Sequence, residues 1–202
     1  MNQELNNLVE LYRDQFLPIY SELVARLIDK PLQTLIEIEN IFTHIMNYLD
    51  QSNSTDIQQK NLEKAYNHLS RLILDSYKII WVEVGKEIDK FFGDRLILKF
   101  GANLSENNLK EAYIKFKNLG ISARKLEIET VGKSILASIE GYEKAIKQGD
   151  VILRSFDIDK IRELEKFSLW DKVKSQSVGI FLSFPVGVGA GILATYIWTK
   201  WS

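Results

Sequence analysis

Two stretches of the chain carry polar side chains whose types could perform acid–base chemistry. Between residues 31 and 49, polar residues recur at every third or fourth position, which places them on one face of a helix. They are Gln33, Glu37, Asn40, His44 and Asn47. Between residues 56 and 92 the same spacing recurs for Lys64, Asn67, His68, Arg71, Asp75 and Lys78. If the two helices pack antiparallel, the two polar faces meet at one edge.

We call this expected edge the polar edge. Its members are Glu37, Asn40, His44, His68, Arg71 and Asp75. Histidine, arginine and carboxylate side chains at a shared edge could bind phosphate or transfer protons. The alternative is the solvated face of two amphipathic helices, and we favour it because neither histidine has a partner at short sequence spacing.

Motifs for cofactor, metal or covalent chemistry do not appear in the chain. It contains two histidines, neither at metal-ligand spacing, and no cysteine. Phosphate-binding glycine loops and the nucleophile elbow of hydrolases are missing as well. We therefore predict no cofactor, no metal and no assigned catalytic residue.

The elements that would position these residues are helices. Apolar residues follow helical spacing over residues 4–28, where Pro18 predicts a kink or break, and again over residues 31–49. Residues 56–92 read as one long helix or two collinear ones, preceded by a polar loop that supplies N-cap candidates. The first part of the chain is thus predicted to be a helical bundle.

The later elements are less regular. Residues 95–100 could form a strand or a helical turn, and both remain open. A helix is expected over residues 109–147, with a break at Gly120–Ser122 left open, Ser105 as a plausible N-cap and Gly149 as its C-terminal cap. Asp159 is expected to cap a last helix. The fold class predicted is all-α: a helical bundle over residues 1–172, followed by one C-terminal transmembrane helix over residues 175–199.

The predicted transmembrane helix rests on charge and length. The 25 residues between Lys174 and Lys200 carry no charge. A helix of that length reaches about 37 Å, and the apolar core of a bilayer is about 30 Å thick. Trp170 precedes the run, and Trp198 and Trp201 lie at its far end, as interfacial anchors do. The run therefore predicts a membrane protein with a single span.

Charges beside the run predict its orientation. Five basic residues precede it within a short distance and one follows it: Lys160, Arg162, Lys166, Lys172, Lys174 and then Lys200. The positive-inside rule places the N-terminal domain in the cytoplasm and makes the chain tail-anchored.

Small residues recur at every fourth position of the run: Gly179, Ser183, Gly187, Gly191 and Thr195. Such spacing lets two membrane helices approach closely, so we expect these residues to form a contact between copies of the chain. The predicted partners are the lipid bilayer and further copies, with a protein partner left open.

Overall charge argues against binding nucleic acid through a basic surface. The chain has 26 basic and 27 acidic residues and a formal net charge of −1. Strong electrostatic binding to phosphate backbones requires a clear excess of basic residues on one face.

One family resemblance arises from residues 31–49 and 61–81, PLQTLIEIENIFTHIMNYL and NLEKAYNHLSRLILDSYKIIW. This pair resembles the central helical hairpin of HEPN domains, which occur in prokaryotic toxins and antiviral systems. Nuclease members carry an arginine followed by a polar residue and, a few positions on, a histidine. Here Leu72 follows Arg71, and His68 precedes it. The resemblance therefore implies the fold and a defence context, and does not carry ribonuclease activity over.

Three functions remain open on the sequence. The favoured one is a membrane-anchored effector that oligomerises and perturbs the bilayer in prokaryotic antiviral defence. The second is a membrane-tethered HEPN-like ribonuclease that uses Glu37, His68 and Arg71. The third is a tail-anchored adaptor or regulator.

Overall fold

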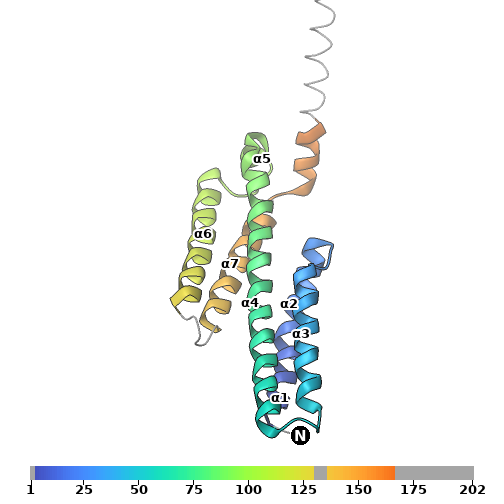
Figure 1. The fold of residues 1–202 in the computed structure, drawn as a ribbon. Helices are drawn as coiled ribbons and strands as arrows, with labels where there is room; N and C mark the ends of the chain where they lie inside the picture. Colours follow the sequence, from blue (N-terminus) through green and yellow to red (C-terminus); the bar gives the residue numbers. More distant parts are fainter. Residues whose placement is uncertain (1–2, 130–135, 167–202) are drawn as a thin grey trace, which may run out of the picture. The chain divides into compact units, whose positions relative to one another are not determined.

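The computed structural model describes residues 3–129 and 136–166, and these are helical almost throughout (Figure 1). No strand occurs in this part of the chain, which contains only an isolated bridge between Ala102 and Phe156. The all-α prediction is confirmed. The described residues divide into two compact units, one of residues 3–94, 104–129 and 136–155, the other of residues 95–103 and 156–166.

The first unit begins with an almost continuous helical stretch. Helix α1 (Gln3–Leu11) passes into a π-helical turn η1 (Tyr12–Phe16) and then into α2 (Leu17–Leu27). Pro18 cannot donate a backbone hydrogen bond, and its ring would crowd the carbonyl of Asp14 in an α-helix. The wider π turn ends at Phe16, two residues before this proline, and the helical conformation continues where the sequence predicted a kink or break.

Helix α4 (Thr55–Gly93) is the central element of this unit, with α3 (Leu32–Leu49) packed beside it (Figure 1). It is a single helix of 39 residues, begun by Ser54, whose Oγ accepts a hydrogen bond from the Ile57 amide. Its buried residues face several neighbouring helices and recur along its length. They are Leu62, Ala65, Leu69, Leu72, Ile73, Leu74, Ser76, Ile80, Val84, Gly85 and Ile88.

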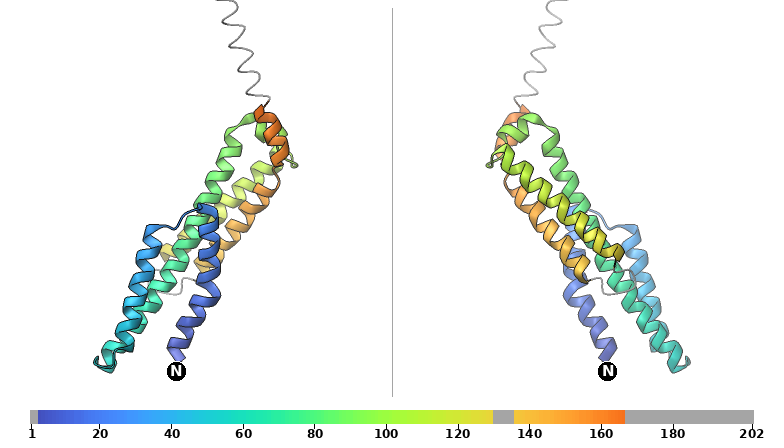
Figure 2. Two further views of the ribbon diagram at one scale, coloured as in Figure 1. Left: turned by 90° about the vertical axis from the view of Figure 1, so that its right-hand side faces the viewer. Right: turned by 90° about the vertical axis from the view of Figure 1, so that its left-hand side faces the viewer.

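The other long helices of this unit are α6 (Glu106–Glu129) and α7 (Leu136–Arg154), which pack on each other, and α7 also packs on α4 (Figure 2). Ser105 begins α6, as predicted: its Oγ accepts from the Asn108 amide. Gly120 does not break α6, which is continuous. Gly149 does not end α7 either; it lies inside the helix, five residues before its last residue, Arg154.

The second unit contains α5 (Arg95–Phe100) and a helix that begins at residue 158 and is described as far as residue 166. Residues 95–100 are therefore helical, which resolves the open alternative. Ile97, Phe156 and Ile161 are buried in this unit. The predicted cap Asp159 is wrong by two residues, because Asp157 Oδ1 accepts from the amides of Asp159 and Lys160.

The predicted transmembrane run and the boundary at residues 172–175 lie outside the described residues. Within residues 3–129 and 136–166, no helix combines the length and apolar character that a membrane crossing requires.

Candidate functional site

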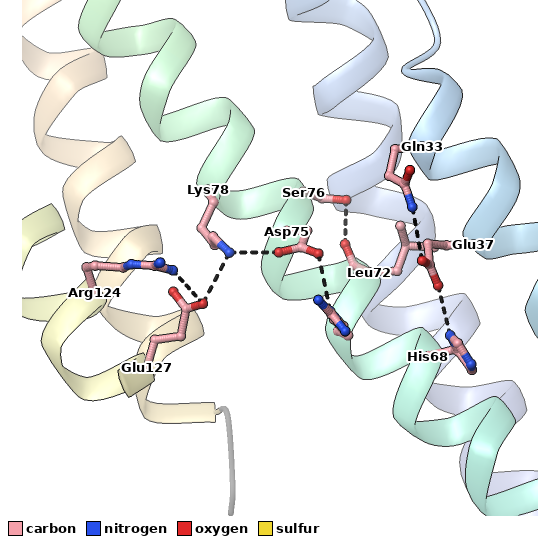
Figure 3. Close-up of polar contacts among 10 residues, drawn as sticks. Gln33, Glu37, His68, Leu72, Asp75, Ser76, Lys78, Arg124 and Glu127 are labelled. Carbon is pink, nitrogen blue, oxygen red and sulfur yellow. Dashed lines mark hydrogen bonds and ion pairs between the residues drawn. The ribbon is translucent and has the colours of Figure 1, made fainter. Parts of the chain in front are cut away.

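The α3–α4 pair brings three of the six predicted polar-edge residues together, namely Glu37, His44 and His68. His68 Nδ1 on α4 lies 2.8 Å from Glu37 Oε2 on α3, and Gln33 Nε2 donates to the other carboxylate oxygen at 3.1 Å (Figure 3). An ionised carboxylate only accepts hydrogen bonds, so His68 Nδ1 carries the proton. In the neutral ring, the lone pair is then on Nε2.

His44, on α3, is oriented in the same way by Asn61 of α4. Its Nδ1 lies 2.9 Å from Asn61 Oδ1, while Asn61 Nδ2 donates to the Ile57 carbonyl. The second bond fixes which end of the amide faces the ring, so His44 Nδ1 donates to Asn61. The His44 and His68 rings are stacked, with centroids 5.2 Å apart and an angle of 26° between their planes.

This arrangement is suited to proton transfer. Each imidazole is held through Nδ1 by an acceptor, which leaves Nε2 as the atom that can take a proton. Orientation of one ring nitrogen by a carboxylate is also common in metal-binding histidines. However, the described residues contain no group of three or more histidine, cysteine, aspartate or glutamate side chains that could hold a metal ion.

The other polar-edge residues do not join the histidines. Asn40 is partly buried on α3, one turn from both Glu37 and His44. Arg71 is 79 % exposed, and its Nε is 3.9 Å from Asp75 Oδ2. Asp75 Oδ1 accepts instead from Lys78 Nζ at 2.8 Å, which directs this carboxylate away from Glu37 (Figure 3).

Asp75 belongs to a second network that the sequence did not reveal. Lys78 Nζ also reaches Glu127 Oε1 on α6 at 3.1 Å, and Arg124 Nη1 lies 2.7 Å from the same oxygen (Figure 3). Burial opposes ionisation of Glu127, but the hydrogen bonds from Arg124 and Lys78 outweigh it and hold its pKa below the usual value. The network therefore joins α4 to α6 through charge-assisted bonds.

Tyr142 on α7 extends this network. The side chain is buried, and its hydroxyl donates to Glu127 Oε2 at 3.3 Å. Burial, together with the charge of Glu127, raises the pKa of Tyr142 to about 12. Two pairs of this network, Arg124 with Glu127 and Asp75 with Lys78, have an i, i+3 spacing that was visible in the sequence. Lys78 and Tyr142 reach Glu127 from other helices, and local spacing says nothing of such contacts.

The predicted membrane contact residues Gly179, Ser183, Gly187, Gly191 and Thr195 lie outside the described part of the chain. Comparison of the chain with family models, with curated proteins and with solved structures gives no match.

Proposed function

We propose that the chain is a membrane-anchored helical effector that self-associates and perturbs the bilayer in prokaryotic antiviral defence. The observation that carries this proposal is the uncharged run between Lys174 and Lys200, with tryptophans near both ends. The length and the flanks suit one bilayer crossing. The defence context comes from the HEPN resemblance of residues 31–49 and 61–81.

Anchoring is tested by a reporter fused after Ser202 of the full chain. The basic flank before the run predicts a reporter outside the cytoplasm and a chain that resists carbonate extraction. A full-length chain released by carbonate contradicts the anchor.

Self-association through the run is tested by paired glycine substitutions. Gly187→Ile with Gly191→Ile removes the close approach of two helices and raises hydrophobicity, so insertion is retained. We expect loss of crosslinked oligomers in the membrane together with loss of membrane depolarisation. Gly189→Ile is the matched control, because residue 189 lies about 200° around the helix from residue 187. If the paired substitution abolishes the oligomers but the unmodified chain does not depolarise the membrane, the adaptor is favoured instead.

A second candidate function, an RNA-cleaving enzyme, is favoured by one observation: the stacked, oriented pair His44 and His68. One imidazole could take the proton of a ribose 2′-hydroxyl and the other could protonate the leaving oxygen. The purified full chain would then cleave a labelled single-stranded RNA. His68→Ala should lower the rate by about 100-fold or more.

Glu37→Gln separates orientation from proton transfer in that experiment. It keeps a hydrogen-bond acceptor for His68 Nδ1 but removes the charge, so a smaller loss and a shifted pH profile are expected. Lys60→Ala, at an exposed site of α4 outside the polar edge, is the matched control. If the unmodified chain leaves RNA intact, or if His68→Ala leaves the rate unchanged, the polar edge is not a nuclease site.

A further inference from the structure

Helix α3 presents its larger apolar side chains to solvent. Its fully buried residues are Thr34 and Ile41, whereas six apolar residues on another face are 41–72 % exposed. We call these six the α3 strip. They are Leu32, Leu35, Ile36, Phe42, Met46 and Leu49. Monomeric soluble proteins rarely expose a continuous apolar surface of this kind unless it binds something.

The strip has the spacing of a helix that pairs with another helix. From Leu32 the positions 35, 39, 42, 46 and 49 follow at alternating intervals of three and four residues. This is the a and d pattern of a coiled coil, and it extends from the first to the last residue of α3. Glu39 is the single charged residue in that line.

We propose that a second copy of this chain covers the strip with its own α3, antiparallel and related by a two-fold axis. In a two-fold contact, residue i meets residue j and j meets i. An axis midway between Asn40 and Ile41 places Leu32 against the partner's Leu49. It also places Leu35 against the partner's Met46 and Glu39 against the partner's Phe42. The first apolar residue of each α3 line then pairs with the last one of the partner's line, so neither line extends past the end of the contact.

The charge of Glu39 selects the antiparallel direction. A parallel pair in register would place the two Glu39 carboxylates in one layer, where like charges repel. The antiparallel pair sets each carboxylate beside a phenyl ring instead. Glu39 thus weakens the contact without preventing it, and it disfavours the other direction.

The size of the contact indicates a weak dimer. One five-turn helix on each side is smaller than the roughly 800 Å² per partner of a standard stable interface. A weak contact gains from a common membrane, where tethering raises the effective concentration. The pairing itself rests on α3 alone and does not require the membrane-perturbing role.

Crosslinking tests the pairing and its direction. Because the chain has no cysteine, single cysteines can be introduced into the full chain without background. Leu35→Cys mixed with Met46→Cys, on differently tagged copies, should form a disulfide-linked dimer. Leu35→Cys alone should not. A crosslink of Leu35→Cys with itself overturns the antiparallel arrangement. Absence of any crosslink between copies overturns the dimer.

Opposite effects at neighbouring positions provide the second test. Sedimentation in mild detergent uses the full chain carrying Gly187→Ile and Gly191→Ile, so that the α3 strip is the contact under test. In this background the dimer should be lost with Leu35→Glu. Glu39→Leu should tighten it by about tenfold or more, since the carboxylate no longer has to leave water. Asn47→Glu adds a charge to α3 at an exposed position outside the strip and should change nothing. Circular dichroism checks that each variant is folded, and a dimer unaffected by Leu35→Glu overturns the proposal.

The two proposals fail separately in these experiments. If carbonate extracts the chain while the crosslink between residues 35 and 46 persists, the anchor is wrong and the α3 contact stands. If the chain remains in the membrane and depolarises it without that crosslink, the anchor stands and the α3 contact is wrong.

Discussion

Tyr142 and Glu127 show how burial and one neighbouring charge set the behaviour of a single residue. The hydroxyl of Tyr142 is withdrawn from water beside a carboxylate, so the neutral phenol is favoured in the folded chain. Glu127 remains ionised because Lys78 and Arg124 face it. The two residues thus have their pKa values moved in opposite directions by one network.

Tyr142 should make stability depend on alkaline pH. Its folded pKa of about 12 lies above the ordinary value of 10.0. The neutral side chain therefore favours folding, fully below pH 10 and progressively less as pH rises toward 12. Two pKa units correspond to a loss of about 3 kcal/mol in the free energy of unfolding. Urea unfolding between pH 9 and 12 should show a shallower decline for Tyr142→Phe. Tyr66→Phe, at an exposed site, is the control, and parallel curves for Tyr142→Phe and the unmodified chain contradict this assignment.

Ile28 holds an unfavourable backbone conformation after α2. Its φ is 56°, and the residue caps the helix through a bond from its amide to the Val24 carbonyl. A β-branched residue is strained there, by about 1–2 kcal/mol, whereas asparagine adopts this conformation readily. The side chain is 92 % exposed, so little packing is lost on replacement. Ile28→Asn should raise the free energy of unfolding by about 1 kcal/mol in urea titrations, while Ile28→Val should leave it unchanged. A less stable asparagine variant would show that the isoleucine makes a compensating contact.

At the scale of elements, α4, α6 and α7 approach closely where glycines lack a side chain at the contact. A Cβ on Gly120 of α6 would lie 2.2 Å from the Trp81 ring of α4. A Cβ on Gly149 of α7 would lie 2.3 Å from Val84 Cγ1 and 3.0 Å from the Phe116 ring. Glycine inside a helix is unfavourable by itself, so its presence here is explained by packing.

Alanine substitution at two glycines should therefore have opposite effects. Gly149→Ala gains helix propensity but overpacks the buried Val84, and we expect a net loss of about 1–2 kcal/mol in the free energy of unfolding. Gly85→Ala, where the nearest atom would be 3.6 Å away, should instead gain about 0.5–1 kcal/mol. Thermal unfolding should show a lower melting temperature for Gly149→Ala and a higher one for Gly85→Ala than for the unmodified chain.

A double variant checks the cause. Val84→Ala removes the atom that a Cβ on residue 149 would meet, so Gly149→Ala should be much less costly in that background. An unchanged cost would mean that Val84 is not the obstacle.

The same glycines mark the limit of what the sequence could predict. The helical spacing of apolar residues correctly predicted that α3 and α4 are helical, and the N-cap preference of serine correctly predicted that Ser105 begins α6. Both features depend on neighbours within one or two turns. Gly149 resembled a helix end, since its true role depends on Val84, a residue 65 positions earlier. Spacing placed Glu37 and His68 on helix faces that meet in the α3–α4 pair. It could not show that Lys78 also reaches Glu127, a residue 49 positions later.

At the scale of the whole molecule, the proposed assembly has two separate contacts, the α3 strip and the small-residue face of the uncharged run. Each is self-complementary, and each can therefore join one chain to one other. If different neighbours satisfy the two contacts, the chain extends beyond dimers. If one neighbour satisfies both, assembly stops at two copies and each contact strengthens the other.

Crosslinking in membranes distinguishes these arrangements, and we expect extension beyond dimers. The unmodified chain should give a ladder of products, and either Leu35→Glu or the Gly187→Ile, Gly191→Ile pair should reduce it to dimers. Combining all three substitutions should leave monomers, because two independent contacts are then lost. Asn47→Glu with Gly189→Ile, the controls outside the two contacts, should keep the full ladder. Products larger than dimers in the Leu35→Glu chain would contradict this scheme, since one remaining two-fold contact cannot join three copies.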